Sequence, residues 1–174
     1  MACRRTKVLL NDVERGVLNQ LRALVHRHGA EVWPKVSFKD AVDINNSGIS
    51  EELFSYAMRA HLDYVVTDGK SSRVLFAVEY DGADHFKRPA TIERDRKKSE
   101  VCRTLAFDLL RITKCQLEGI FLNSNQLELL VERWFEEYER ARESPTLAIR
   151  KPPSNAQYIR DISRPGSTNN TAAG

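Results

Sequence analysis

The sequence predicts an α/β fold in which helices surround a few strands within a single domain. Apolar residues recur at helical spacing over 13–24 and 127–138, and short apolar runs typical of strands lie between them. A content of 41% hydrophobic and 29% charged residues is ordinary for one soluble domain. We expect residues 1–143 to form this domain and the Pro-, Ser- and Asn-rich residues 144–174 to form a flexible tail.

The first predicted element is a helix from Asn11 to Val25. Asn11 is a suitable N-cap, and Glu14 follows three residues later, at the reciprocal position of a capping box. The apolar stripe of this helix has the spacing of a surface that faces a core, and it comprises Val13, Val17, Leu21 and Leu24.

A strand and a short helix are predicted next. Glu31 to Phe38 has the composition of a strand, and Pro34 within it indicates an edge or bulged strand because proline has no N–H to donate. Asp43 to Ser50 is rich in turn residues, and Glu51 to Met58 favours a short helix. The sequence does not indicate what this short helix does.

The middle of the chain predicts an antiparallel hairpin. Ala60–Val66 and Val74–Gly82 are rich in residues that favour strands, and Thr67–Ser72 between them has the composition of a turn. Folding the two strands back on each other can bring Asp63 beside Glu79.

Two helices and one further strand complete the prediction. Thr91 is a plausible N-cap for a helix over Arg94–Leu105, Phe107–Ile112 is expected to be the fourth strand, and Asn125–Arg142 an amphipathic helix. One face of that last helix is apolar and comprises Leu127, Leu130, Val131, Trp134, Phe135 and Tyr138. We expect this face to pack on the sheet; a dimer surface is the alternative.

Acidic side chains gather at the end of the hairpin. Glu79 and Asp81 stand two residues apart, so both project from the same face of a strand. Together with Asp63 they would place three carboxylates close together, where they repel each other unless a cation lies between them. Mg²⁺ takes oxygen ligands of this kind. The alternative is that these acids are solvated where the strand runs into a loop.

Basic residues dominate the segment that follows. Seven Lys and Arg and three Asp and Glu lie between Lys87 and Arg103. A solvated helix face is one interpretation. The other is a cationic patch beside an anionic metal site, which would suit a phosphodiester substrate.

The motif that these residues form resembles the PD-(D/E)xK nuclease superfamily. It comprises Asp63, the strand end Glu79-Tyr80-Asp81-Gly82-Ala83-Asp84-His85, the run Arg94-Asp95-Arg96-Lys97-Lys98 and the strand Leu109-Leu110-Arg111-Ile112. It is most similar to bacterial families whose strand ends in E-x-D-G-x-x-H, which in turn are similar to very-short-patch repair endonucleases. The resemblance implies a restriction-endonuclease-like α-β-β-β-α-β core with a small mixed sheet flanked by helices.

The resemblance also implies roles for individual residues. Asp63 corresponds to the acid on the second strand and Glu79 to the acid on the third, and with Asp81 they would hold Mg²⁺ or Mn²⁺. The lysine that usually follows two residues after the third-strand acid is replaced by Asp81. A basic residue of the next helix can take over, with Lys98 preferred to Lys97. His85 matches the histidine near the metal site, although a polar loop residue is an equal alternative, and Glu14 corresponds to an acid on the first helix.

The expected function is therefore metal-dependent hydrolysis of DNA, with RNA as the alternative substrate, by an enzyme predicted to be an endonuclease. The residues expected to contact nucleic acid are Lys87, Arg88, Arg94, Lys97 and Arg111. Arg94 could instead pair with Asp95. Two alternatives remain open: a catalytically inactive nuclease fold that binds nucleic acid, and a scaffold whose acids are merely solvated.

Several classes of protein are not favoured by the sequence. No apolar run reaches membrane-spanning length, and no signal peptide is evident. The three cysteines, Cys3, Cys102 and Cys115, lack metal-ligand spacing and indicate free thiols in a reducing cytoplasm. No phosphate-binding glycine loop is present, and the oligomeric state is not predicted.

Overall fold

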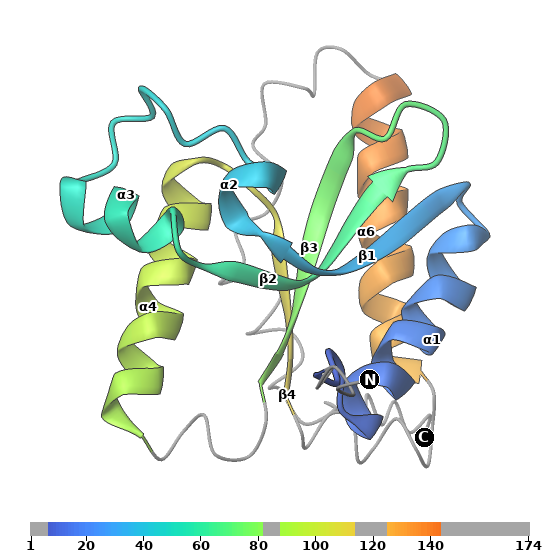
Figure 1. The fold of residues 1–174 in the computed structure, drawn as a ribbon. Helices are drawn as coiled ribbons and strands as arrows, with labels where there is room; N and C mark the ends of the chain where they lie inside the picture. Colours follow the sequence, from blue (N-terminus) through green and yellow to red (C-terminus); the bar gives the residue numbers. More distant parts are fainter. Residues whose placement is uncertain (1–6, 82–87, 114–124, 144–174) are drawn as a thin grey trace, which may run out of the picture.

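A four-stranded mixed sheet forms the centre of the protein, with helices on both faces (Figure 1). The structure is a computed structural model that describes residues 7–81, 88–113 and 125–143. Its elements are, in chain order, α1 (Asp12–His26), β1 (Ala30–Ser37), α2 (Phe38–Ala41), α3 (Glu51–Ala57), β2 (His61–Asp68), β3 (Val74–Asp81), α4 (Pro89–Thr104), β4 (Leu109–Thr113) and α6 (Asn125–Glu143).

The sheet has the order β1-β2-β3-β4. β1, β2 and β3 are antiparallel neighbours, whereas β4 runs parallel to β3 and is reached through α4, the kind of crossover that a parallel pair requires. In the β2–β3 register Tyr64 lies opposite Val78, so the next pair outward is Asp63 and Glu79. The register of β3 with β4 places Glu79 beside Arg111.

The two faces of the sheet have separate hydrophobic cores. α1 and α6 cover one face, where Val78 and Phe76 of β3 are buried. α3 and α4 lie on the other, where Ala77 packs near Val101. Burying a side chain such as Phe76 stabilises the fold by about 1.5–3 kcal/mol. By the alternation of a strand, Glu79 and Asp81 continue the face of Ala77 and so lie on the side of α4.

The predicted first helix and hairpin are confirmed. The Asn11 side chain accepts a hydrogen bond from the Glu14 backbone N–H at 2.9 Å, and the Asn11 backbone N–H donates to Glu14 Oε2 at 2.9 Å, which completes the capping box. β2 and β3 form the expected antiparallel pair. β1, which contains Pro34, is at an edge of the sheet, as predicted.

The start of α4 differs from the prediction. The helix begins at Pro89 with Arg88 at its N-cap, five residues before the expected start at Arg94, and Thr91 is buried in the first turn instead of capping it. Proline suits the first helical position because the N–H that it lacks has no partner there. The short α2 was not predicted from the sequence.

None of the helices within the described ranges has both the length and the apolar character needed to cross a membrane. The expected tail after residue 143 lies outside the described residues.

Candidate functional site

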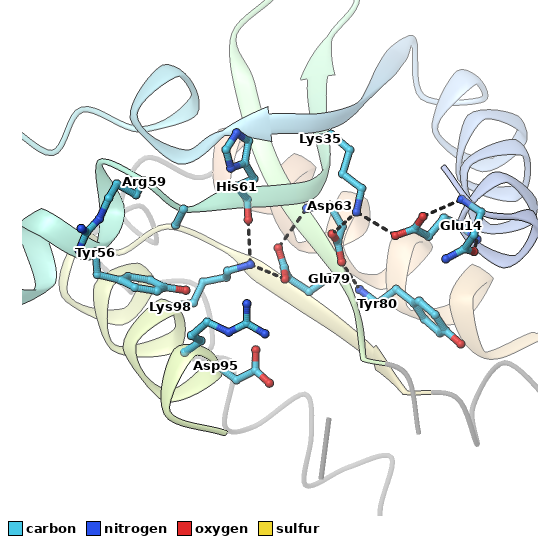
Figure 2. Close-up of a pocket in the computed structure, with 13 residues that line it drawn as sticks. Glu14, Lys35, Tyr56, Arg59, His61, Asp63, Glu79, Tyr80, Asp95 and Lys98 are labelled. Carbon is cyan, nitrogen blue, oxygen red and sulfur yellow. Dashed lines mark hydrogen bonds and ion pairs between the residues drawn. The ribbon is translucent and has the colours of Figure 1, made fainter. Parts of the chain in front are cut away.

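A cavity of about 730 Å³ opens beside the ends of β2 and β3 and is bordered by α1, α3 and α4 (Figure 2). Four acidic and four basic side chains contribute to its lining. The lining residues are Asn11, Glu14, Lys35, Tyr56, Arg59, Ala60, His61, Asp63, Glu79, Tyr80, Arg94, Asp95 and Lys98.

Glu79 and Lys98 form a buried ion pair in this cavity. The Lys98 Nζ lies 2.6 Å from Glu79 Oε2 and also donates a hydrogen bond to the backbone oxygen of His61 at 2.8 Å. The Glu79 side chain is only 5% exposed and that of Lys98 11%. Burial raises the pKa of the Glu79 carboxyl, and the negative charge of Asp63 adds to this effect, although Lys98 opposes it.

Lys97, one residue earlier on the same helix, points elsewhere. Its Nζ pairs with Glu52 of α3 at 2.6 Å and lies 3.7 Å from Glu93. Adjacent residues of an α-helix point about 100° apart, so one of the two lysines reaches Glu79 and the other does not. The structure thus brings Lys98, the lysine preferred from the sequence, to the acid on β3.

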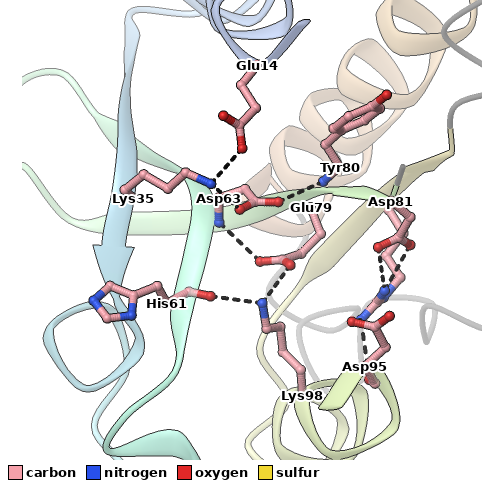
Figure 3. Close-up of polar contacts among 10 residues, drawn as sticks. Glu14, Lys35, His61, Asp63, Glu79, Tyr80, Asp81, Asp95 and Lys98 are labelled. Carbon is pink, nitrogen blue, oxygen red and sulfur yellow. Dashed lines mark hydrogen bonds and ion pairs between the residues drawn. The ribbon is translucent and has the colours of Figure 1, made fainter. Parts of the chain in front are cut away.

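Asp63 lies directly beside Glu79 (Figure 3). The Asp63 backbone N–H donates to Glu79 Oε1 at 3.1 Å, and Asp63 Oδ2 accepts a hydrogen bond from the Tyr80 backbone N–H at 3.1 Å. These reciprocal contacts across β2 and β3 fix both carboxylates at one corner of the hairpin. The structure therefore brings together two of the three predicted metal ligands.

Lys35 is a member of the site that the sequence did not reveal. Its Nζ lies between Asp63 Oδ1, at 2.9 Å, and Glu14 Oε1, at 2.8 Å. Burial lowers the pKa of the Lys35 ammonium, but the hydrogen bonds to Glu14 and Asp63 outweigh this effect and the pKa is raised. Glu14, expected as an acid on the first helix, thus caps α1 with one oxygen and pairs with Lys35 through the other.

The backbone explains how Lys35 reaches Asp63. Lys35 has a φ of 54°, in the left-handed region, and the β1–β2 ladder skips from the Pro34–Tyr64 pair to the Val36–Leu62 pair. The pair that is skipped, Lys35 and Asp63, meets through its side chains instead. A single sequence carries no clear signal for this interruption.

Asp81, the third predicted ligand, has different surroundings. Arg111 Nη1 donates to both Asp81 oxygens, at 2.9 and 2.8 Å, and Arg111 Nη2 donates to the backbone oxygen of Asp95 at 3.3 Å (Figure 3). The Asp81 side chain is 8% exposed. In the part of the chain that the structure describes, no three Asp, Glu, His or Cys side chains are placed to hold a metal ion together. Instead of the expected cluster of three carboxylates, Asp63 and Glu79 lie together, and Asp81 forms an ion pair with Arg111.

Asp63 and Glu79 alone form a donor set that fits a hard divalent cation. Mg²⁺ is commonly bound through one or two carboxylates, with waters and substrate phosphate completing its shell. Glu79 is desolvated and stands next to a second negative charge, so a cation nearby would stabilise its ionised form.

The predicted nucleic-acid contacts are dispersed. Arg94 is exposed and lines the cavity, and Arg88 is exposed at the N-cap of α4. The Arg111 side chain is 12% exposed and pairs with Asp81 and Asp95. Burial lowers the pKa of Arg111, but the charge of Asp81 and its hydrogen bonds outweigh this effect, so the pKa is raised. His85 and Lys87 lie outside the described residues. Much of the basic character of α4 is neutralised locally, since Arg96 pairs with Glu93 and Glu100 and Lys97 with Glu52.

Residues 6–129 match the family described as "Protein of unknown function (DUF2726)". The chain belongs to the DUF2726 family. The matched range contains every cavity residue as well as Asp81 and Arg111. No curated protein and no solved structure matches the chain.

Proposed function

We propose that this DUF2726 protein is a metal-dependent nuclease that hydrolyses phosphodiester bonds in DNA and has a restriction-endonuclease-like core. One observation carries the proposal: Lys98 of α4 meets Glu79 of β3, 2.6 Å away, beside Asp63 of β2. Two acids on neighbouring strands with an adjacent lysine are what the resemblance to PD-(D/E)xK nucleases implies. Here the lysine comes from the helix, because Asp81 stands two residues after Glu79.

Asp63 and Glu79 would hold the cation in this proposal. A bound Mg²⁺ or Mn²⁺ would supply Lewis acidity, which polarises a phosphate oxygen and favours deprotonation of the attacking water. Residues of the chain would position the donor and hold the carboxylates. The Lys98 ammonium is held between Glu79 and the His61 backbone oxygen, so it is positioned to donate a hydrogen bond to the attacking water or to the charged phosphate oxygens. The Asp63 backbone N–H donates a hydrogen bond to Glu79 Oε1, which holds the Glu79 carboxylate beside Asp63.

A second candidate, a nuclease fold that binds nucleic acid without cutting it, is favoured by a specific observation. Each acid at the site already has a cation in direct contact: Lys98 lies 2.6 Å from Glu79, and Lys35 lies 2.9 Å from Asp63. Such pairs balance the carboxylate charges without a metal ion.

Cleavage assays on supercoiled, linear, single-stranded and branched DNA, and on RNA, would test the proposal. With Mg²⁺ or Mn²⁺ we expect wild-type protein to cut at least one DNA substrate and Glu79→Gln and Asp63→Asn to lose this activity. Glu100→Gln makes the same chemical change as Glu79→Gln on the outer face of α4, where Glu100 pairs with Arg96, and should stay active. If DNA binds but is never cut with either metal, the second candidate replaces the first.

A further inference from the structure

One wall of the cavity carries basic and aromatic side chains that the proposed chemistry does not use. Tyr56 belongs to α3, Arg59 follows it, and Arg94 lies on α4. All three line the cavity that also contains Glu79 and Lys98. α3 stands between β1 and β2 in the chain, and nothing in the sequence indicated its purpose.

The two arginines differ from the other bases of the cavity. Lys35 and Lys98 each contact a carboxylate. Within the described ranges neither Arg59 nor Arg94 forms an ion pair. Arg59 Nε donates to the Ser55 backbone oxygen at 3.1 Å, and Arg94 Nη2 has a long contact of 3.4 Å with Thr91 Oγ1. Most guanidinium N–H groups of both residues therefore remain available to an anion.

The Tyr56 hydroxyl adds a neutral donor to this wall. Figure 2 shows the Tyr56 ring extending into the cavity toward Lys98, with Arg59 beside it. Burial raises the pKa of Tyr56 to about 12, with contributions from the charges of Glu79 and Asp95, so the hydroxyl keeps its proton at neutral pH. No described residue accepts a hydrogen bond from it.

Tyr56 and Arg59 lie across the cavity from Glu14 and Asp63 (Figure 2), and Arg94 lines the same cavity from α4, next to Asp95 in the chain. A guanidinium presents paired N–H groups that match the oxygens of a phosphate. The cavity volume of about 730 Å³ is in the range that accepts a group the size of a nucleotide.

We propose that Tyr56, Arg59 and Arg94 form a phosphate-binding subsite that holds the phosphate next to the one hydrolysed. The assignment of that phosphate to a nucleic acid rests on the proposed function. The recognised chemistry, a phosphate ester, is shared by the backbone of a strand and by the terminal phosphate of a free nucleotide. α3 thus supplies one wall of the substrate site.

Binding without metal tests this subsite separately from catalysis. The full chain in EDTA is titrated into a fluorescein-labelled single strand of DNA that lacks terminal phosphates, and anisotropy is measured over a range of salt concentrations. Thymidine 5′-monophosphate is then added as a competitor. The variants are Arg59→Gln, Arg94→Gln and Tyr56→Phe. Arg103→Gln is the matched control, because Arg103 is exposed in the last turn of α4 and is not among the cavity residues.

We expect Arg59→Gln and Arg94→Gln each to weaken binding about tenfold and Tyr56→Phe to weaken it about threefold, with Arg103→Gln close to wild type. Each arginine variant should also reduce the slope of log affinity against log salt by about one. Arg59 and Arg94 are exposed and Tyr56→Phe keeps the ring, so unchanged melting curves would separate lost binding from lost folding.

Competition by the nucleotide would support the subsite and assign it to terminal phosphates. Strand binding without such competition would support it and assign it to the backbone. The subsite is overturned if Arg59→Gln and Arg94→Gln bind the strand like Arg103→Gln, or if wild-type protein does not bind the strand. A protein that shows this pattern in EDTA but neither binds metal nor cuts DNA would keep the subsite and lose the nuclease.

Discussion

Glu79 and Asp81 stand two residues apart on β3, share one face of the sheet and are both buried, yet they have different partners. Glu79 lines the cavity and contacts Lys98 and the Asp63 backbone. Asp81 is not among the cavity residues, and both of its oxygens accept from Arg111.

The difference lies in how each carboxylate is held. Arg111 Nη1 contacts both oxygens of Asp81, while Nη2 contacts the Asp95 backbone oxygen, so Arg111 ties the Asp81 carboxylate to α4. The ammonium of Lys98 is a compact charge that contacts one oxygen of Glu79, beside a second carboxylate and an open cavity. The E-x-D spacing alone does not distinguish the two acids; their partners do.

The largest effect is expected where the structural pair is broken. Arg111→Met leaves Asp81 as a buried charge without its guanidinium, which should lower the free energy of unfolding by about 3–5 kcal/mol. Urea denaturation measures this loss. The double variant Asp81→Leu/Arg111→Met should recover most of it, because well-packed apolar residues can replace a buried ion pair. A single variant as stable as wild type would show that the pair contributes nothing.

Lys98 is expected to affect catalysis, and because its pair with Glu79 is as buried as that of Arg111 with Asp81, urea denaturation of the variant must be measured alongside its activity. Lys98→Met should slow DNA cleavage by about a hundredfold or more, since it removes a positioned donor from the site of charge development. Lys97→Met makes the same change one residue away, where the lysine pairs with Glu52, and should cut at nearly the wild-type rate. Equal losses in the two variants would contradict the assignment of Lys98.

Substitution of Lys35 tests whether its ammonium competes with a metal ion for Asp63. Its ammonium lies between Glu14 and Asp63, so it competes electrostatically with a metal ion at Asp63. Lys35→Met should tighten Mn²⁺ binding about tenfold, as measured by calorimetry. Unchanged or weaker binding would show that Lys35 does not compete with the metal.

A smaller effect is expected in the pH dependence of stability. The pKa of Glu79 is raised in the folded protein from its ordinary value of 4.5, so above that value the folded state binds more protons than the unfolded state. The free energy of unfolding of wild-type protein in EDTA should therefore fall, relative to Glu79→Gln, as pH rises from 4.5 through the folded pKa. If the wild-type free energy of unfolding rose relative to that of Glu79→Gln over this range, the pKa of Glu79 would be lowered in the folded protein instead of raised.

Local chemistry made part of this arrangement predictable. The capping box of Asn11 and Glu14 fixed the start of α1, and the turn between two apolar runs indicated the hairpin that joins Asp63 to Glu79. The preference for Lys98 followed from the resemblance and agrees with the observed contact. These signals lie within short stretches of chain or in a known order of motifs.

The remaining features depend on contacts between distant segments. Arg111 and Asp81 are thirty residues apart, and only the parallel pairing of β3 with β4 brings them together. Lys35 reaches Asp63 because its own backbone is left-handed, and the residue types of this segment do not predict that conformation. α4 begins at Pro89, upstream of Thr91, although threonine is the residue type that more often caps a helix.

The most direct test of the central claim is a calorimetric titration of the protein with Mn²⁺ in the absence of DNA. We expect saturable binding to wild-type protein that Asp63→Asn and Glu79→Gln each abolish and Glu100→Gln leaves intact. Mn²⁺ binding of equal affinity in all four proteins, or no binding to wild type, would contradict it.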